Sequence, residues 1–167
     1  MNRYLLSTLL ALSVPLAVAA QAAGGEAATL NAAVGKAKVK LADGLKASAA
    51  KGKPISGKYE MEEGKLQLSV YTSKADAYSE VIVDHTTGKV AKSEALTKPE
   101  DLEAAKLQSA AMAKAKKTLA DAVTHAVETH QGARALSATP TLKDGHAVVD
   151  VVLVTPQGEA TVSEPLD

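Results

Sequence analysis

This sequence of 167 residues contains no cysteine, no phenylalanine and no tryptophan, so four tyrosines are its only aromatic residues. Without cysteine the chain can form no disulfide, offer no thiolate to a metal and use no cysteine nucleophile. Its core must be built from Leu, Val, Ile and much Ala, whose small side chains bury little apolar area each. We therefore expect modest stability, and we expect any small sub-units to pack together.

Signals for catalysis and for nucleic-acid binding are also missing. The formal net charge is zero, which gives no excess of basic residues to attract nucleic acid or an anionic membrane. No serine lies in a Gly-x-Ser-x-Gly elbow, and no glycine-rich phosphate loop occurs. We predict a protein that is not an enzyme, uses no cofactor and binds no nucleic acid.

The N-terminal residues 1–22 have the pattern of an export signal. Asn2-Arg3 gives a short positive start, residues 5–19 are almost entirely apolar, and a run of small residues follows. The apolar run is shorter than the roughly 20 residues that a spanning helix needs. We predict cleavage after Ala22, with Ala20 as the second choice, and a mature protein in the periplasm or secreted, with no membrane span.

A block that occurs twice is the strongest architectural signal in the chain. Leu41-Ala42-Asp43 and Leu119-Ala120-Asp121 each open a helical stripe, and each stripe is followed by a polar turn ending in Gly64 or Gly145 and then by an alternating strand. This repetition predicts an α+β fold with two copies of one small helix-plus-sheet unit.

Two details of the helices follow from the same periodicity. The stripe from Leu30 to Ala49 predicts one helix that enters the first unit from upstream. The helix that starts at Thr97 either continues unbroken to Gln131 or restarts at Thr118, where Thr118 and Asp121 form a capping pair.

Residues 84–89 predict a hairpin turn. An Asp84 side-chain oxygen is expected to accept the backbone N–H two residues on, and Gly88 is expected to adopt a positive φ. The same residues are also compatible with an anion or metal loop, a less common use of such a sequence.

With these units laid out, the pattern resembles a tandem pair of PepSY domains. The resemblance implies small α+β units with one helix across an antiparallel sheet, as found in protease propeptides and bacterial envelope proteins that are proposed to restrain peptidases. It brings no catalytic residues. The segments that carry it are 41–43, 118–122, 64–70, 145–151 and the hairpin 81–90.

The resemblance divides the chain into a signal peptide (1–22), a first repeat (23–96) and a second repeat (97–167). When Val162 is aligned with Val83, Asp84 falls on Ser163, so the second repeat lacks the closing hairpin. No protease domain follows in this sequence, and we expect any restraint of a peptidase to act in trans.

One face of the helix expected after Leu119 offers a candidate metal site. Asp121, His125 and Glu128 lie within one stripe, where they predict a Zn²⁺ or Cu²⁺ site or, more commonly, a solvated face with i,i+4 pairing. His125 and His130 lie too far apart around the helix to share a metal.

The strand 146–155 is apolar on both faces apart from Asp150. Val148, Val152 and Val154 form its second face, which either packs against the other repeat or binds a partner. An open strand edge left by the missing hairpin is a further place for an extended peptide. The leading expectation is a non-enzymatic exported protein that binds a protein or peptide in the cell envelope. The alternative is a metal or small-ligand binder that uses Asp121, His125 and Glu128.

Overall fold

The computed structural model describes residues 17–167, so most of the predicted signal peptide, residues 1–16, lies outside the described part. The fold is mixed α+β, as predicted, and within the described residues no helix is long and apolar enough to cross a membrane. The elements are α1 (Ala17–Lys36), α2 (Leu41–Ser48), β1 (Lys53–Glu62), β2 (Lys65–Lys74), β3 (Ala77–Val83), β4 (Val90–Ala95), α3 (Pro99–Lys114), α4 (Leu119–Glu128), β5 (Arg134–Lys143), β6 (His146–Thr155) and β7 (Gly158–Pro165).

The seven strands of residues 17–167 form one antiparallel sheet in the order β4-β3-β2-β1-β5-β6-β7. The strands of residues 53–95 form one half of the sheet and those of residues 134–165 form the other. The halves join at the centre, where Gly57 pairs with Ala138 and Lys58 pairs with Ser137. The sheet is therefore continuous, and a single hydrophobic cluster extends through both halves.

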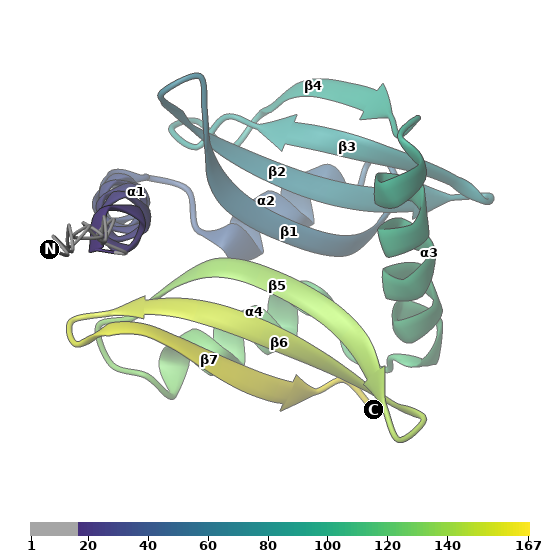
Figure 1. The fold of residues 1–167 in the computed structure, drawn as a ribbon. Coiled ribbons are helices and arrows are strands. Elements are labelled where there is room, and N and C mark those ends of the chain that lie inside the picture. Colours follow the sequence, from purple (N-terminus) through teal and green to yellow (C-terminus); the bar gives the residue numbers. More distant parts are fainter. Residues whose placement is uncertain (1–16) are drawn as a thin grey trace, which may run out of the picture.

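Helices α2 and α4 pack against each other and against one face of the sheet, behind it in Figure 1. Alternation along the strands sends apolar side chains to this face. Leu68 of β2 and Leu153 of β6 are fully buried there, with Leu45 of α2 and Val123 of α4. Helix α3 runs across the ends of the central strands (Figure 1), and its Gln108 accepts a hydrogen bond of 2.7 Å from the Ser56 hydroxyl.

The expectation of one helix from Leu30 to Ala49 is wrong, because the chain breaks between α1 and α2. The amides of Lys38 and Val39 donate to the carbonyl of His85, 3.0 Å away in each case, and so leave the helical pattern. Lys40 is extended, with φ −84° and ψ 155°. A contact between segments distant in sequence thus overrides a helical periodicity that is locally continuous.

Before the second sheet half, the helix restarts at Thr118, one of the two predicted alternatives. Thr118 is extended, and its Oγ1 accepts the Asp121 amide at 3.1 Å. The Asp121 carboxylate in turn accepts the Thr118 hydroxyl at 2.7 Å. This side-chain cap satisfies a backbone donor at the start of α4 that would otherwise lack a partner.

The two halves share local irregularities as well as element order. Glu63-Gly64 and Asp144-Gly145 each form a two-residue hairpin turn in which both residues have positive φ. Each half also carries a β-bulge in the strand before that turn, where one extra residue interrupts the register. The extra residue is Ile55 in β1 and Leu136 in β5, and Leu136 follows Ile55 by the same number of residues as Gly145 follows Gly64.

The third strands of the two halves correspond differently from the sequence alignment. Val81 of β3 pairs with Val70 of β2, and in the same way Val162 of β7 pairs with Val151 of β6. The hairpins β2–β3 and β6–β7 both have two-residue turns, so the strands stay in step and Val162 corresponds to Val81, not to Val83. Within the described residues β4 has no counterpart, and β4 and β7 are the sheet edges.

Candidate functional site

The segment 84–89 forms the predicted hairpin turn. Asp84 Oδ1 accepts the Thr86 amide at 2.8 Å and the Thr87 amide at 2.7 Å, and Gly88 has φ 74°. These backbone donors hold the pKa of the exposed Asp84 carboxyl below its usual range, and the Thr87 amide contributes the most. The carboxylate is used by the turn, which leaves little reason to interpret this segment as a ligand loop.

The predicted metal stripe is exposed, and its three side chains have different neighbours. His125 Nδ1 lies 2.9 Å from Glu164 Oε2 on β7, while Asp121 is bonded to Thr118. Glu128 lies at the wall of a cavity described below. Among the described residues, no group of three or more His, Asp or Glu side chains is placed to hold a metal ion. The structure therefore gives His125 a carboxylate partner from β7, outside the predicted set.

Val148, Val152 and Val154 are half-buried. Val152 and Val154 pack against the core cluster, so the second apolar face of β6 is partly covered. Asp150, which interrupts this face, accepts a 2.8 Å hydrogen bond from the Lys143 ammonium group. A partner-binding role for the three valines stays a prediction.

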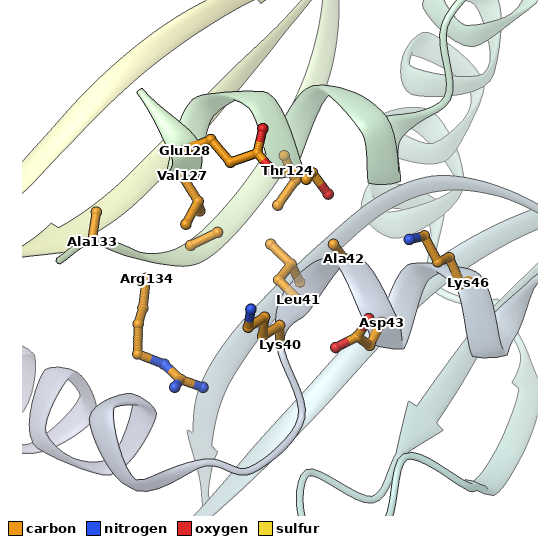
Figure 2. A pocket seen from close by; sticks show the side chains of 12 residues that line it. Lys40, Leu41, Ala42, Asp43, Lys46, Thr124, Val127, Glu128, Ala133 and Arg134 are labelled. Carbon is orange, nitrogen blue, oxygen red and sulfur yellow. The ribbon is translucent and has the colours of Figure 1, made fainter. Parts of the chain in front are cut away.

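Two open cavities lie on the side of the sheet that α2 and α4 cover, and sequence analysis did not find them. The first, called here the Arg134 cavity, has a volume of about 380 Å³ and lies between the start of α2, the end of α4 and the start of β5. Figure 2 shows its polar side chains: Lys40 just before α2, Asp43 on α2, Glu128 on α4 and Arg134 on β5. Leu41 contributes to its apolar part.

The second, called here the Lys53 cavity, has a volume of about 470 Å³. It lies between the end of α2, the start of β1 and the link that joins α3 to α4. Leu45, Met112 and Leu119, each nearly fully buried, contribute apolar surface to it. Lys46 lines both cavities, so the two hollows are neighbours on the surface formed by α2 and α4.

The two cavities occupy corresponding places in the two halves of the molecule. A basic residue at the start of a central strand marks each one, Arg134 on β5 and Lys53 on β1. Arg134 Nη2 donates to the Ala37 carbonyl at 2.8 Å, just after α1, and Lys53 Nζ donates to the Met112 carbonyl at 2.6 Å, near the end of α3. Arg134 thus holds the chain at the end of α1, just before the α2 wall of its cavity. Lys53 holds the end of α3, just before the link and the α4 wall of its cavity.

Charge distinguishes the cavities. The Arg134 cavity has three cationic side chains and two carboxylates, Asp43 and Glu128. The Lys53 cavity has four lysines and a single carboxylate, Asp121, which is already bonded to Thr118. Among the described residues, none of these four lysines forms an ion pair. The Lys53 cavity therefore has the larger excess of positive charge.

Comparison with protein-family models, curated proteins and solved structures gives no match for this chain. The resemblance to PepSY domains accordingly rests on the sequence motifs quoted above. Sequence reasoning missed both cavities because their walls come from segments far apart in the chain. Its nearest local signal was the pair Lys116-Lys117 directly before the cap residue Thr118.

Proposed function

We propose that this chain is a non-enzymatic, exported binding protein made of two PepSY-like repeats, residues 23–96 and 97–167, which engages a protein or peptide partner in the cell envelope. Restraint of a peptidase in trans is the activity that the resemblance implies. The export pattern of residues 1–22 supports the location. The correspondence of the turns, bulges and basic anchors in the two halves supports the duplication.

The observation that carries the proposal is the pair of adjacent cavities on the α2–α4 surface. Each has a volume within the range of ordinary ligand sites, and each combines apolar surface with charged side chains. Because Lys46 borders both cavities, an extended partner can occupy the two at once. A small ligand would fill only one of them and would make no use of their being adjacent. This arrangement favours a peptide segment as the ligand.

Site-specific photo-crosslinking in the native cells tests the proposal. A benzophenone amino acid in place of Ala49, an exposed residue of the Lys53 cavity, is expected to capture a discrete protein or peptide partner. The same group in place of Lys65, exposed at the β1–β2 hairpin and outside both cavities, is the matched control. Absence of adducts, or the same adducts from both positions, would contradict the proposal.

Export is tested separately by recovering the protein from the envelope fraction and sequencing its N-terminus. A mature chain that begins at Ala23 is expected if cleavage follows Ala22. An uncleaved chain that is confined to the cytoplasm would overturn the proposed location, whatever the crosslinking shows.

A further inference from the structure

The Lys53 cavity has a chemistry that specifies its partner more closely, and this step rests on the proposed function. We propose that it binds an acidic peptide segment of the partner, with an apolar side chain in the hollow and flanking carboxylates on the lysines at the rim. The proposal depends on the origin of the four lysines, on the two of them that have no side-chain hydrogen bond or ion pair, and on the apolar surface between the four.

The four lysines come from three separate segments. Lys46 is on α2, Lys53 starts β1, and Lys116 and Lys117 are in the link before α4. All four are exposed, so each can reach an approaching carboxylate. A ligand with several negative charges spread along a chain matches this distribution better than a ligand with one charged group.

Two of these lysines are committed to backbone carbonyls, and two are not. Lys53 Nζ donates to Met112, and Lys117 Nζ donates to Pro165 at 3.2 Å. For Lys46 and Lys116 the described residues provide no side-chain hydrogen bond or ion pair. A partner carboxylate can therefore engage these two ammonium groups without breaking a hydrogen bond or an ion pair, and Lys116 also interacts electrostatically with Asp167.

The surface between the lysines explains why an apolar side chain accompanies the charges. Leu45, Met112 and Leu119 belong to the core, yet they also line the cavity, and Pro54 and Ala115 complete its apolar part. A partner side chain seated here removes apolar surface of both molecules from water, which stabilises the complex. Carboxylates around it supply orientation and selectivity more than affinity.

The Arg134 cavity is the less suitable of the two for the same ligand. Asp43 and Glu128 oppose its three cationic groups, and its Arg134 guanidinium is bonded to Ala37. An acidic segment that occupies the Lys53 cavity meets Asp121 as the one carboxylate among the lining residues, and Asp167, whose charge interacts with Lys116, lies nearby. This difference selects the Lys53 cavity as the acidic-peptide site.

The test uses capped pentapeptides with a central Leu, Met or Phe flanked by two glutamates on each side, and matched peptides with glutamine in place of glutamate. Binding to the full chain is measured by calorimetry or fluorescence anisotropy at low and at physiological ionic strength. We expect at least one acidic peptide to bind more tightly than its glutamine counterpart, with a preference that weakens as salt is added. Equal binding of the acidic and neutral peptides, or binding of neither, would overturn the proposal.

Three variants locate the site. Lys46→Glu/Lys116→Glu should lower the affinity for the acidic peptide by about tenfold, because two attractions become repulsions. Lys65→Glu/Lys106→Glu changes the net charge equally at exposed residues outside the cavities and should have little effect. Asp121→Asn removes the repulsive carboxylate, retains an oxygen for the Thr118 hydroxyl, and should strengthen binding.

Equal losses from the two charge-reversal pairs would show that general charge, and not this cavity, attracts the peptide, and the proposal would fall. The result also separates the two levels of inference. If crosslinking from Ala49 finds a partner while the acidic peptides fail to bind, the partner-binding proposal stands and the acidic-segment proposal is wrong. If both fail, both are wrong.

Discussion

His85 and Leu166 play the same part in the two halves of the molecule. The His85 carbonyl accepts the amides of Lys38 and Val39, and the Leu166 carbonyl accepts the amides of Lys116 and Lys117, at 2.7 and 3.0 Å. In both cases two successive amides of the link before a helix are bound by one residue that follows the third strand. Each helix is thereby attached to its own sheet half by the same contact.

The first prediction concerns which face of α4 stabilises the fold. Leu119 is 2% exposed in the core, so Leu119→Ala should lower the free energy of unfolding by about 2–5 kcal/mol. His125→Ala is the comparison on the exposed face of the same helix: the His125 side chain is 64% exposed and its partner Glu164 is 13% exposed, so the loss should be about 1 kcal/mol, the upper end for a surface pair. Urea denaturation of the two variants measures both effects. Similar losses from both would mean that burial on α4 is assigned to the wrong face.

A second prediction uses the correspondence between the halves to design a rescue. Gly44 is the fourth residue of α2, and a Cβ added there would lie 2.5 Å from Leu68 Cδ2. In the other half the fourth residue of α4 is Ala122 and the fourth residue of β6 is Val149, so a larger helix residue accompanies a smaller strand residue. Overpacking against the buried Leu68 should cost about 1–3 kcal/mol, and the gain of about 1 kcal/mol in helix propensity offsets part of it, so Gly44→Ala should destabilise by up to about 2 kcal/mol.

Adding Leu68→Val to Gly44→Ala should recover part of this loss, because the pair then has the same side chains as Ala122 and Val149. A double-mutant cycle from urea denaturation gives the coupling between the two sites. Leu68→Val alone is the control and should be mildly destabilising, since it removes a buried methylene. Strictly additive effects would show that Gly44 and Leu68 do not pack against each other as described.

The third prediction concerns Tyr59, whose hydroxyl donates to the Val39 carbonyl at the break between α1 and α2. Burial raises the pKa of Tyr59 to about 12, and the nearby Arg134 only partly opposes this increase. Because the pKa is higher in the folded state, the associated stabilisation is complete below the unfolded value of about 10 and is lost as the pH rises through 12.

Tyr59→Phe should lower the free energy of unfolding near neutral pH by about 1 kcal/mol, since the hydrogen bond is lost while the ring remains. It should also weaken the further loss of stability seen on raising the pH above about 10. Denaturation at neutral and alkaline pH measures both effects. An alkaline loss of the same size in the variant would assign that loss to other groups.

These cases also show why some parts of the structure are predictable from sequence and others are not. The Asp84 turn and the Thr118 cap depend on side chains within three residues of the backbone groups they bind, so their sequence pattern is sufficient. The break at Lys38 and Val39 depends on the carbonyl of His85, which is distant in sequence. Helical periodicity continues across that break, and it carries no information about such a partner.

The candidate site belongs to the second category. Lys53 and Met112 come together only because α3 crosses the start of β1, and neither position has a local motif. The stripe of Asp121, His125 and Glu128 was visible in sequence because its members share one helix. Its neighbour Glu164, on β7, was not. The correspondence of Val162 with Val81 likewise depends on the length of both hairpin turns.

The last prediction concerns acid stability and the turn at Asp84. Backbone hydrogen bonds from Thr87 and Thr86 hold the pKa of the Asp84 carboxyl below its usual range in the folded state. A group with a depressed folded pKa stabilises the protein above its unfolded pKa, and this contribution is lost as the pH falls through the folded value. The wild-type protein should therefore lose stability as the pH falls below about 4.

Asp84→Asn keeps an oxygen that can accept the same two amides but removes the charge that titrates. The variant should be less stable than wild type at neutral pH, because amide donors bond more strongly to a carboxylate than to a neutral oxygen. Its stability should then depend less on acid, so the two proteins should converge as the pH falls through the lowered pKa of the folded wild-type Asp84 carboxyl. Urea denaturation across this range, with an NMR titration of the wild-type carboxyl, measures the effect. A constant difference between the two proteins at every pH would contradict it, because the lost stability would then have no connection with the protonation of Asp84.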